Sequence, residues 1–121
     1  MGTASEKLPR ARLIRRRAIF TAARERGRRL TNRWMTLSVL PRDPAAPPDP
    51  AEVAFLTPKR IGSAVIRNKL RRRMREIYRR TPDIMRDVYL VWIARPSAAD
   101  LPFDELKDCM TTLLHRAGKL T

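Results

Sequence analysis

The residues with the clearest chemical potential in this chain are arginines at helical spacing near its middle. Four of them recur at every fourth position: Arg67, Arg71, Arg75 and Arg79. On an α-helix, residues four apart lie one above the other, so these four form a continuous row. A guanidinium binds phosphate through two parallel hydrogen bonds and also stacks on bases. The row, flanked by Asn68 and Arg72, predicts a helix that binds nucleic acid.

The charge balance of the chain supports this interpretation. Lys and Arg number 27 against 12 Asp and Glu, which gives a formal net charge of +15 over 121 residues. Such a chain repels itself, and a polyanionic partner offsets that cost. The alternative is a solvated basic surface. The cations are clustered rather than spread, however, and Glu76 is the only acid of the basic run, so we favour a nucleic-acid partner.

The approach to the basic run favours RNA in particular. Lys59 and Arg60 place two cations just before it, Gly62 permits close backbone approach, and Ser63 can cap the first helical turn. Free N–H groups at the start of a helix bind phosphate. Side-chain cations and backbone donors along one edge suit a folded RNA backbone better than a small ligand.

The sequence shows no combination of residues that would let the protein itself catalyse a reaction. His115 is the only histidine and Cys109 the only cysteine. No Ser-His-Asp set or metal-ligand cluster is visible, and the acids outside the basic run are scattered. Cys109 lies on the apolar face of a predicted helix, which indicates a buried, inert thiol. We predict no catalytic residues and leave open whether the protein holds a metal ion.

The expected compartment is the cytoplasm. A single cysteine cannot form an intrachain disulfide, which is typical of cytosolic chains. No apolar run approaches the roughly 20 residues that span a bilayer. The first residues lack the apolar stretch of a secretory signal. We therefore expect no contact with a membrane.

Helices and strands that position these residues can be predicted from the spacing of apolar residues. We expect helices over residues 15–26, 64–80 and 104–117, and strands over residues 33–40, 53–56 and 88–94. Gly27 and Gly118 are the expected stops of the first and last helix. The core-facing residues of the middle helix are expected to be Ile66, Leu70, Met74 and Ile77. The order is α-β-β-α-β-α, an α+β fold.

The chain length indicates one domain over residues 11–118, with a flexible N-terminal tail over residues 1–10 and a C-terminal tail over residues 119–121. Residues 41–51 contain five prolines and are predicted to form a surface loop. The run 88–94 is almost entirely apolar, which is typical of a strand at the centre of a sheet.

The segment TPKRIGSAVIRNKLRRRMRE, residues 57–76, resembles the signature of the bacterial ribonuclease P protein subunit. That signature combines a basic pair, a Gly-x-Ala-Val turn, Arg-Asn-Arg, further basic residues and Arg-Glu. Outside it, Arg12-Leu13, Phe20, Gly27, Asn32-Arg33 and Ala94-Arg95 also match, so the resemblance covers roughly residues 10–118. It implies a small two-layer α-β sandwich with a left-handed β-α-β crossover, as in the fold shared by this subunit and domain 2 of ribosomal protein S5. The general rule favours the opposite hand.

The resemblance also implies partners. In this family the RNA subunit performs the hydrolysis that matures the 5′ end of tRNA, with Mg²⁺ needed by the RNA-containing holoenzyme. The protein is an accessory, with one copy expected per RNA. The resemblance places the contact with the catalytic RNA on Arg67, Asn68, Lys69, Arg71, Arg72 and Arg75. Lys69 stands where the family commonly has arginine. Lysine keeps the positive charge but lacks the planar guanidinium that binds phosphate through two parallel hydrogen bonds.

A second surface implied by the resemblance is a cleft between the first helix and the sheet, which holds the single-stranded 5′ leader of precursor tRNA. The residues carried over to it are Phe20, Arg24, Trp34, Thr36, Ser38, Lys59 and Arg60. Arg24 stands where the family has a second cleft aromatic, so leader binding is expected to be more electrostatic. For Trp34, packing against the first helix is the alternative.

Two other functions compete with a ribonuclease P subunit. A structural RNA-binding protein of the ribosomal type would share the composition but lack a substrate cleft. A standalone nuclease or DNA-binding protein is disfavoured by the missing catalytic set and by the absence of a helix-turn-helix pattern. Only the first function requires Phe20, Arg24 and Arg60 to face single-stranded RNA.

Overall fold

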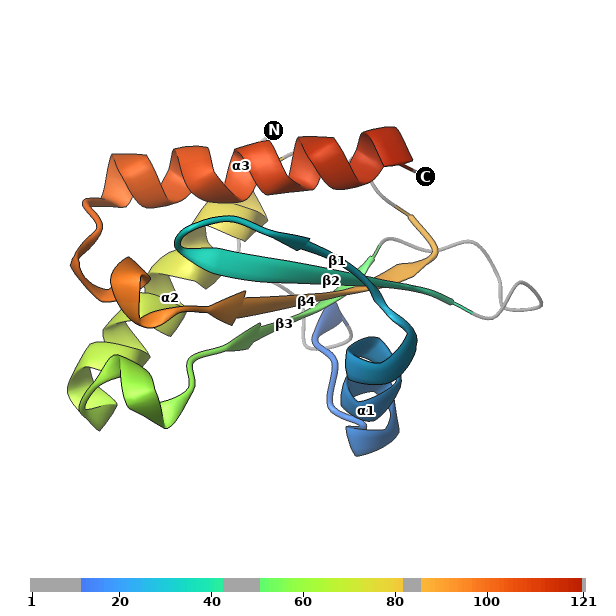
Figure 1. Cartoon of the computed structure of the whole chain (residues 1–121), viewed down its shortest axis with the longest axis horizontal. Helices are drawn as coiled ribbons and strands as arrows, with labels where there is room; N and C mark the ends of the chain where they lie inside the picture. The colour runs from blue at the N-terminus through green and yellow to red at the C-terminus, as the bar shows by residue number, and fades with distance from the viewer. Residues whose placement is uncertain (1–11, 43–50, 82–85, 121) are drawn as a thin grey trace.

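The part of the chain that the structure describes forms one mixed four-stranded sheet and three α-helices. The structure, a computed structural model, describes residues 12–42, 51–81 and 86–120. Its elements in chain order are α1 (Arg17–Arg26), β1 (Arg28–Thr31), β2 (Met35–Pro41), β3 (Glu52–Leu56), η3 (Lys59–Ile61), α2 (Ala64–Arg80), β4 (Val88–Ala94), η4 (Pro96–Asp100) and α3 (Phe103–Leu120). The strand order is β1-β2-β4-β3 (Figure 1).

The strand directions place α2 in a crossover connection. β2 runs antiparallel to both β1 and β4, whereas β3 and β4 are parallel neighbours. Parallel neighbours need a long connection, and here α2 lies in it. The expected β-α-β unit is therefore present. The left-handed sense of this crossover remains a prediction that rests on the family resemblance.

Helices cover both faces of the sheet (Figure 1). The larger core lies under α2 and α3, where Trp92 and Leu37 are fully buried. A smaller cluster on the other face joins Ala23 of α1 to Val91 of β4. Successive strand residues point to opposite faces, which lets each strand supply both cores. The α+β class is confirmed, and α1 adds a layer to the two-layer sandwich that we expected.

The middle of the sheet agrees with its prediction. β4 covers residues 88–94 and lies between β2 and β3, with six of its seven residues buried. Because helices cover both of its faces, nearly every position along β4 must be apolar. The helix predicted over residues 64–80 also has the expected bounds.

Strand β1 is absent from our prediction. Its four residues, Arg28–Thr31, include one buried side chain, that of Leu30. A strand this short and this polar carries no readable alternation. It is an edge strand, defined by its antiparallel pairing with β2, and that pairing is a tertiary contact.

Several predicted boundaries also need correction. α1 begins at Arg17 and β2 at Met35, two residues later than expected. α3 continues through Gly118 to Leu120, so residues 119 and 120 belong to a helix and not to a tail. At the predicted loop 41–51, Pro41 ends β2 and Ala51 is buried, while residues 43–50 lie outside the described residues. The predicted tail 1–10 lies outside them as well.

Candidate RNA-binding surfaces

The start of α2 is built as the sequence predicts. Gly62 adopts φ 154° and ψ −158°, a conformation that is strained for any residue with a Cβ. The Ser63 side chain then accepts a hydrogen bond from the backbone N–H of Ile66 at 3.4 Å. Leu70, Met74 and Ile77 face the core, together with Tyr78. Ile66 does not; it is 43% exposed, which corrects its predicted core position.

The predicted arginine row is tied into the protein. Arg67 Nε donates to the Gly62 carbonyl oxygen at 3.2 Å. Arg71 donates to Thr57 Oγ1 at 2.7 Å and to Asn68 Oδ1 at 3.1 Å. These two guanidiniums hold the start of α2 against the segment after β3. The row is therefore not the free basic face that the spacing suggested, and its first members have structural partners.

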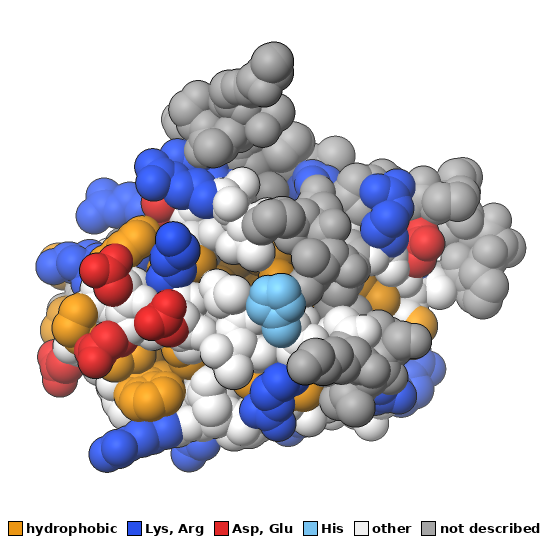
Figure 2. Space-filling view, turned by 90° about the horizontal axis from the view of Figure 1, so that it is seen from above, with side chains coloured by type: hydrophobic (Ala, Val, Ile, Leu, Met, Phe, Trp, Pro, Cys, Tyr) orange, Lys and Arg blue, Asp and Glu red, His pale blue; other side chains and the backbone are white. Residues whose placement is uncertain are grey.

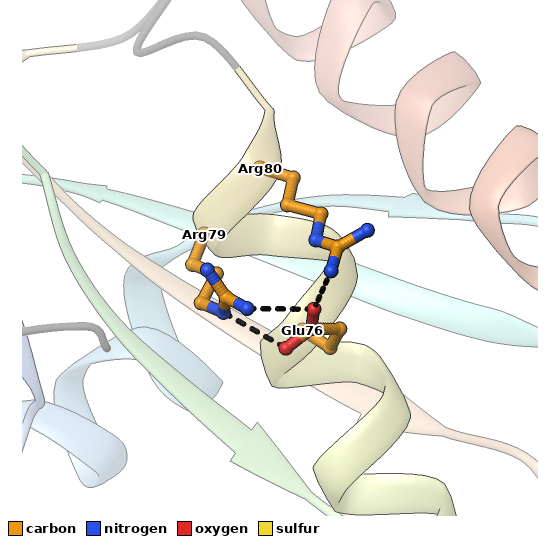
Figure 3. Close-up of polar contacts among 3 residues, drawn as sticks. All are labelled: Glu76, Arg79 and Arg80. Atoms are coloured by element: carbon orange, nitrogen blue, oxygen red, sulfur yellow. Dashed lines mark hydrogen bonds and ion pairs between the residues drawn. The ribbon is translucent and has the colours of Figure 1, made fainter. Parts of the chain in front are cut away.

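At the other end of α2, Glu76 neutralises two arginines (Figure 3). Its carboxylate accepts hydrogen bonds from Arg79 at 2.8 and 2.7 Å and lies 2.6 Å from Arg80 Nη2. The hydrogen bond from Arg79 is the main reason why the pKa of Glu76 lies below its ordinary value. Three side chains thus form a compact ion cluster at the end of the helix (Figure 3). The cationic character of α2 is concentrated before it.

A different set of α2 residues faces solvent. It is exposed along one side of the helix, where Arg72 lies four and three positions after the first two members and three before the last: Asn68, Lys69, Arg72 and Arg75. Within the described residues, the cations of this stripe have no hydrogen bond or ion pair; Asn68 accepts the bond from Arg71. Of the residues predicted to contact the RNA subunit, these four are the ones presented outward. We call them the basic stripe.

The predicted cleft between α1 and the sheet is present. A cavity of about 380 Å³ lies there. Its lining residues come from α1 and all four strands: Arg17, Phe20, Thr21, Ala23, Arg24, Arg29, Ser38, Leu56, Val91 and Ile93. Phe20 and Arg24 are one turn apart on α1, at the spacing that the family resemblance implies for the two cleft positions. Among the described residues, the lining contains three arginines and no acid, so the cavity is electropositive.

Strand pairing explains how the cleft floor is assembled. Arg29, Ser38 and Val91 are register partners across β1, β2 and β4 and point to the same face. The next row on that face runs from Thr36 through Ile93 to Leu56. Thr36 therefore lies on the predicted face of the sheet, in the row next to that of Ser38. It is not part of the cavity lining. The side chains of this second row are partly exposed.

Ser38 has a partner within the protein. It is 1% exposed, and its hydroxyl donates to the Ala23 carbonyl oxygen at 2.9 Å. Gly27 N–H donates to the same oxygen at 3.0 Å. Ser38 thus anchors the end of α1 to β2 at the bottom of the cleft. The basic pair lies elsewhere: Lys59 and Arg60 form the exposed η3 turn after β3 and are outside the cavity lining.

Trp34 is misplaced in our prediction. It precedes β2, in a turn where Asn32 Oδ1 accepts hydrogen bonds from the backbone N–H groups of Trp34 and Met35. Its side chain packs against the larger core and lines a separate hollow beside α3, on the opposite face from the cleft. Period-two alternation therefore does not extend back to this position. Packing against α1, the alternative reading, is wrong for the same reason.

Two of the three cleft arginines are absent from our prediction. Arg17 lies one turn before Phe20 and Thr21, so helical spacing from Phe20 could have found it. Arg29 belongs to the unpredicted β1, and its Nη2 donates to the Arg24 carbonyl oxygen at 3.0 Å. No local signal in the sequence points to Arg29, because only its pairing with Ser38 brings it to the cleft.

The face that carries α3 has a different character. Acidic side chains gather near one end of it (Figure 2), where Asp104, Glu105 and Asp108 are exposed in the first turns of α3. Cys109 is buried there, as expected, and burial raises the pKa of its thiol. Within the described ranges, no three His, Cys, Asp or Glu side chains gather as a metal site, and no helix is long and apolar enough to cross a membrane.

Comparison with known proteins agrees with this architecture. The family model described as Ribonuclease P matches residues 8–118. The chain belongs to the ribonuclease P protein family. It is 34% identical over 114 residues to the ribonuclease P protein component of Symbiobacterium thermophilum, covering 93% of this chain and 96% of the relative. The corresponding component of Gluconacetobacter diazotrophicus is also 34% identical, with 90% and 93% covered.

Solved ribonuclease P proteins share the fold. A Staphylococcus aureus RNase P protein, a mutant with defective mRNA degradation activity, superposes with a TM-score of 0.80 at 23% identity, covering 88% of each chain. The Thermotoga maritima RNase P protein gives a TM-score of 0.76 at 24% identity, with 86% of this chain and 96% of that chain covered. The fold that the sequence resemblance implies is therefore confirmed.

Proposed function

We propose that this protein is the non-catalytic subunit of a ribonuclease P holoenzyme. It binds the catalytic RNA and the 5′ leader of precursor tRNA, and so aids endonucleolytic maturation of the tRNA 5′ end. The RNA performs the hydrolysis and holds the Mg²⁺ that the holoenzyme needs. One protein binds each RNA. Membership of the ribonuclease P protein family supports the proposal. The basic stripe binds the catalytic RNA, and the cleft between α1 and the sheet binds the leader.

The observation that carries the proposal is the composition of the cleft. Phe20 offers an aromatic face to a base, while Arg17 and Arg24 offer charge to the backbone around it. Neither guanidinium has a hydrogen bond or ion pair within the described part of the chain, so both are available to phosphate. A cavity of about 380 Å³ accommodates roughly one nucleotide at a time, which suits a single strand and not a duplex.

The basic stripe supplies the second contact. Lys69, Arg72 and Arg75 are exposed on one side of a capped helix whose other side is buried in the core. A rigid helix that presents unpaired cations binds phosphates with little further ordering. Because the stripe lies on α2 and the cleft lies beneath α1, one protein can engage two different RNA segments. A structural RNA-binding protein of the ribosomal type would need only the stripe.

A reconstitution experiment tests the proposal. The protein is mixed with the catalytic RNA and precursor tRNA at low magnesium, where the RNA alone is slow, and 5′ cleavage is measured. Restored cleavage at the correct position is the expected result. Tight binding of the catalytic RNA without any effect on cleavage would favour the ribosomal-type alternative. Cleavage by the protein without the RNA subunit would contradict the assignment of the chemistry to RNA.

A further inference from the structure

The first turn of α2 exposes two apolar side chains, Val65 and Ile66. Val65 is 77% exposed and Ile66 43%, and with Leu56 they are the exposed large hydrophobic residues among those described. Leu56 belongs to the cleft, whereas Val65 and Ile66 are adjacent on α2. The beginning of α2 projects past the end of the sheet (Figure 1). These two side chains form a small apolar patch, in which Val65 is largely exposed and Ile66 is partly covered.

Folding does not explain the patch. A hydrophobic staple would pair the residue before the cap with the fourth helical residue, but these positions hold Gly62 and Arg67. A glutamate at the third helical position would complete a capping box with Ser63, and that position holds Ile66. β-branched residues are also weaker helix formers than alanine. Stability alone would favour other residues at both positions.

The position of Val65 relative to the basic stripe indicates what kind of partner the patch binds. Val65 lies three and four residues before Asn68 and Lys69, so it continues the same exposed side of α2. Lys69 and Arg72 follow it with no ion pair within the described residues. The first acid on α2 is Glu76, which Arg79 and Arg80 hold at the other end. An apolar tip continuous with unpaired cations fits a polyanion that also offers apolar surface.

We propose that Val65, with Ile66 beside it, packs against an unstacked base or ribose of the catalytic RNA when the basic stripe binds its backbone. Unpaired nucleotides expose apolar base faces, and sequence-specific recognition of RNA mostly targets such nucleotides. The contact adds affinity that does not depend on counterion release, and it selects an RNA with an unpaired nucleotide at this point. This inference rests on the proposed function and refines the contact made by α2.

A near-isosteric variant tests the contact. Val65→Thr keeps the β-branched shape and replaces one methyl group by a hydroxyl, and because the side chain is largely exposed, folding is expected to be unchanged. Binding of the full-length protein to the catalytic RNA is titrated across a range of salt concentrations. We expect roughly fivefold weaker binding at every salt concentration, with an unchanged salt slope. Val65→Ile, which keeps the apolar surface, is expected to bind like the natural protein.

Charge variants provide the matched controls. Lys69→Gln should lower the salt slope by about 0.7–0.9, because one phosphate contact is lost. Lys107→Gln, on α3 and outside the basic stripe, should leave both affinity and slope unchanged. If Val65→Thr binds the catalytic RNA as tightly as the natural protein, or if its salt slope falls, the apolar contact is refuted.

Two further outcomes separate this inference from the proposed function. A loss seen only with precursor tRNA would assign the patch to the substrate and overturn the inference. Failure of the natural protein to bind the catalytic RNA would instead refute the proposed function itself.

Discussion

The Ser38 hydroxyl donates to the Ala23 carbonyl oxygen at 2.9 Å, and this bond joins the centre of β2 to the last turn of α1. The contact is close because Gly27 has no side chain; a Cβ there would collide with Ser38 Oγ and with the Ala23 carbonyl oxygen. The cleft depends on this anchorage, because Phe20 and Arg24 are held over the sheet by the same helix.

Gly27→Ala should therefore be more damaging than loss of the hydrogen bond. We expect it to lower the free energy of unfolding by about 1–3 kcal/mol, since α1 must shift away from β2. Ser38→Ala, which removes the bond without adding a clash, should cost about 0.5–1.5 kcal/mol. Urea denaturation of both variants measures the difference. A cost for Gly27→Ala no greater than that for Ser38→Ala would show that the close approach is unimportant.

Adjacent arginines on α2 should respond in opposite ways. Arg71→Gln loses its hydrogen bonds to Thr57 and Asn68, and we expect the unfolding free energy to fall by about 1 kcal/mol. Arg72→Gln should change stability by less than about 0.5 kcal/mol, yet lower the salt slope of binding to the catalytic RNA by about 0.7–0.9. Denaturation and salt titration of the pair distinguish the two roles. The division between tethered and free cations is wrong if Arg72→Gln destabilises the fold more than Arg71→Gln.

The cleft assignment can be tested through the length of the leader. Phe20→Leu keeps an apolar side chain in the cluster beneath α1 but removes the aromatic face. We expect it to weaken holoenzyme binding of a precursor tRNA with a long leader by about 1–3 kcal/mol, and to leave binding of a leaderless tRNA unchanged. Because the same variant is measured with both substrates, a general effect on folding cancels in the ratio of the two binding constants. Equal losses on both substrates would remove the leader from this cleft.

The ion cluster at the end of α2 predicts a dependence of stability on pH. The pKa of Glu76 is lowered in the folded state, chiefly by the hydrogen bond from Arg79. Its stabilising contribution is therefore complete above the ordinary glutamate pKa of about 4.3 and is lost as the pH falls through the lowered value. The gap in urea midpoint between the natural protein and Glu76→Gln should close on acidification. A gap that is constant between neutral and acidic pH would contradict this assignment.

The sequence and the structure agree best where local rules apply. The bounds of α2, the Ser63 cap and the buried residues Leu70, Met74 and Ile77 follow from spacing and capping within one segment. The apolar run of β4 likewise predicts a central strand, because a strand covered on both faces has few polar positions. Ile66 is the exception on α2: it fits the apolar spacing, but the helix projects beyond the core at that point.

The cleft was harder to predict, because its parts come from segments that are far apart in the chain. Phe20 and Arg24 were placed through the family resemblance and do line it. Trp34 was placed by extending strand alternation into a turn, and the hydrogen bonds of Asn32 rotate that turn to the other face. Arg29 could not be found at all without β1.

The sequence by itself determined the family, the basic helix and its start, because each depends on residue types at fixed short spacings. Only the tertiary structure decided which cations are free. Arg67 and Arg71 look identical to Arg72 and Arg75 in the sequence, but the segment from Thr57 to Gly62 folds back to accept hydrogen bonds from the first pair. Acceptors supplied from outside a helix cannot be read from its own periodicity. They turn the first two arginines of the predicted row of four into structural anchors. Arg75 remains exposed, and Arg79 is neutralised by Glu76 of the same helix.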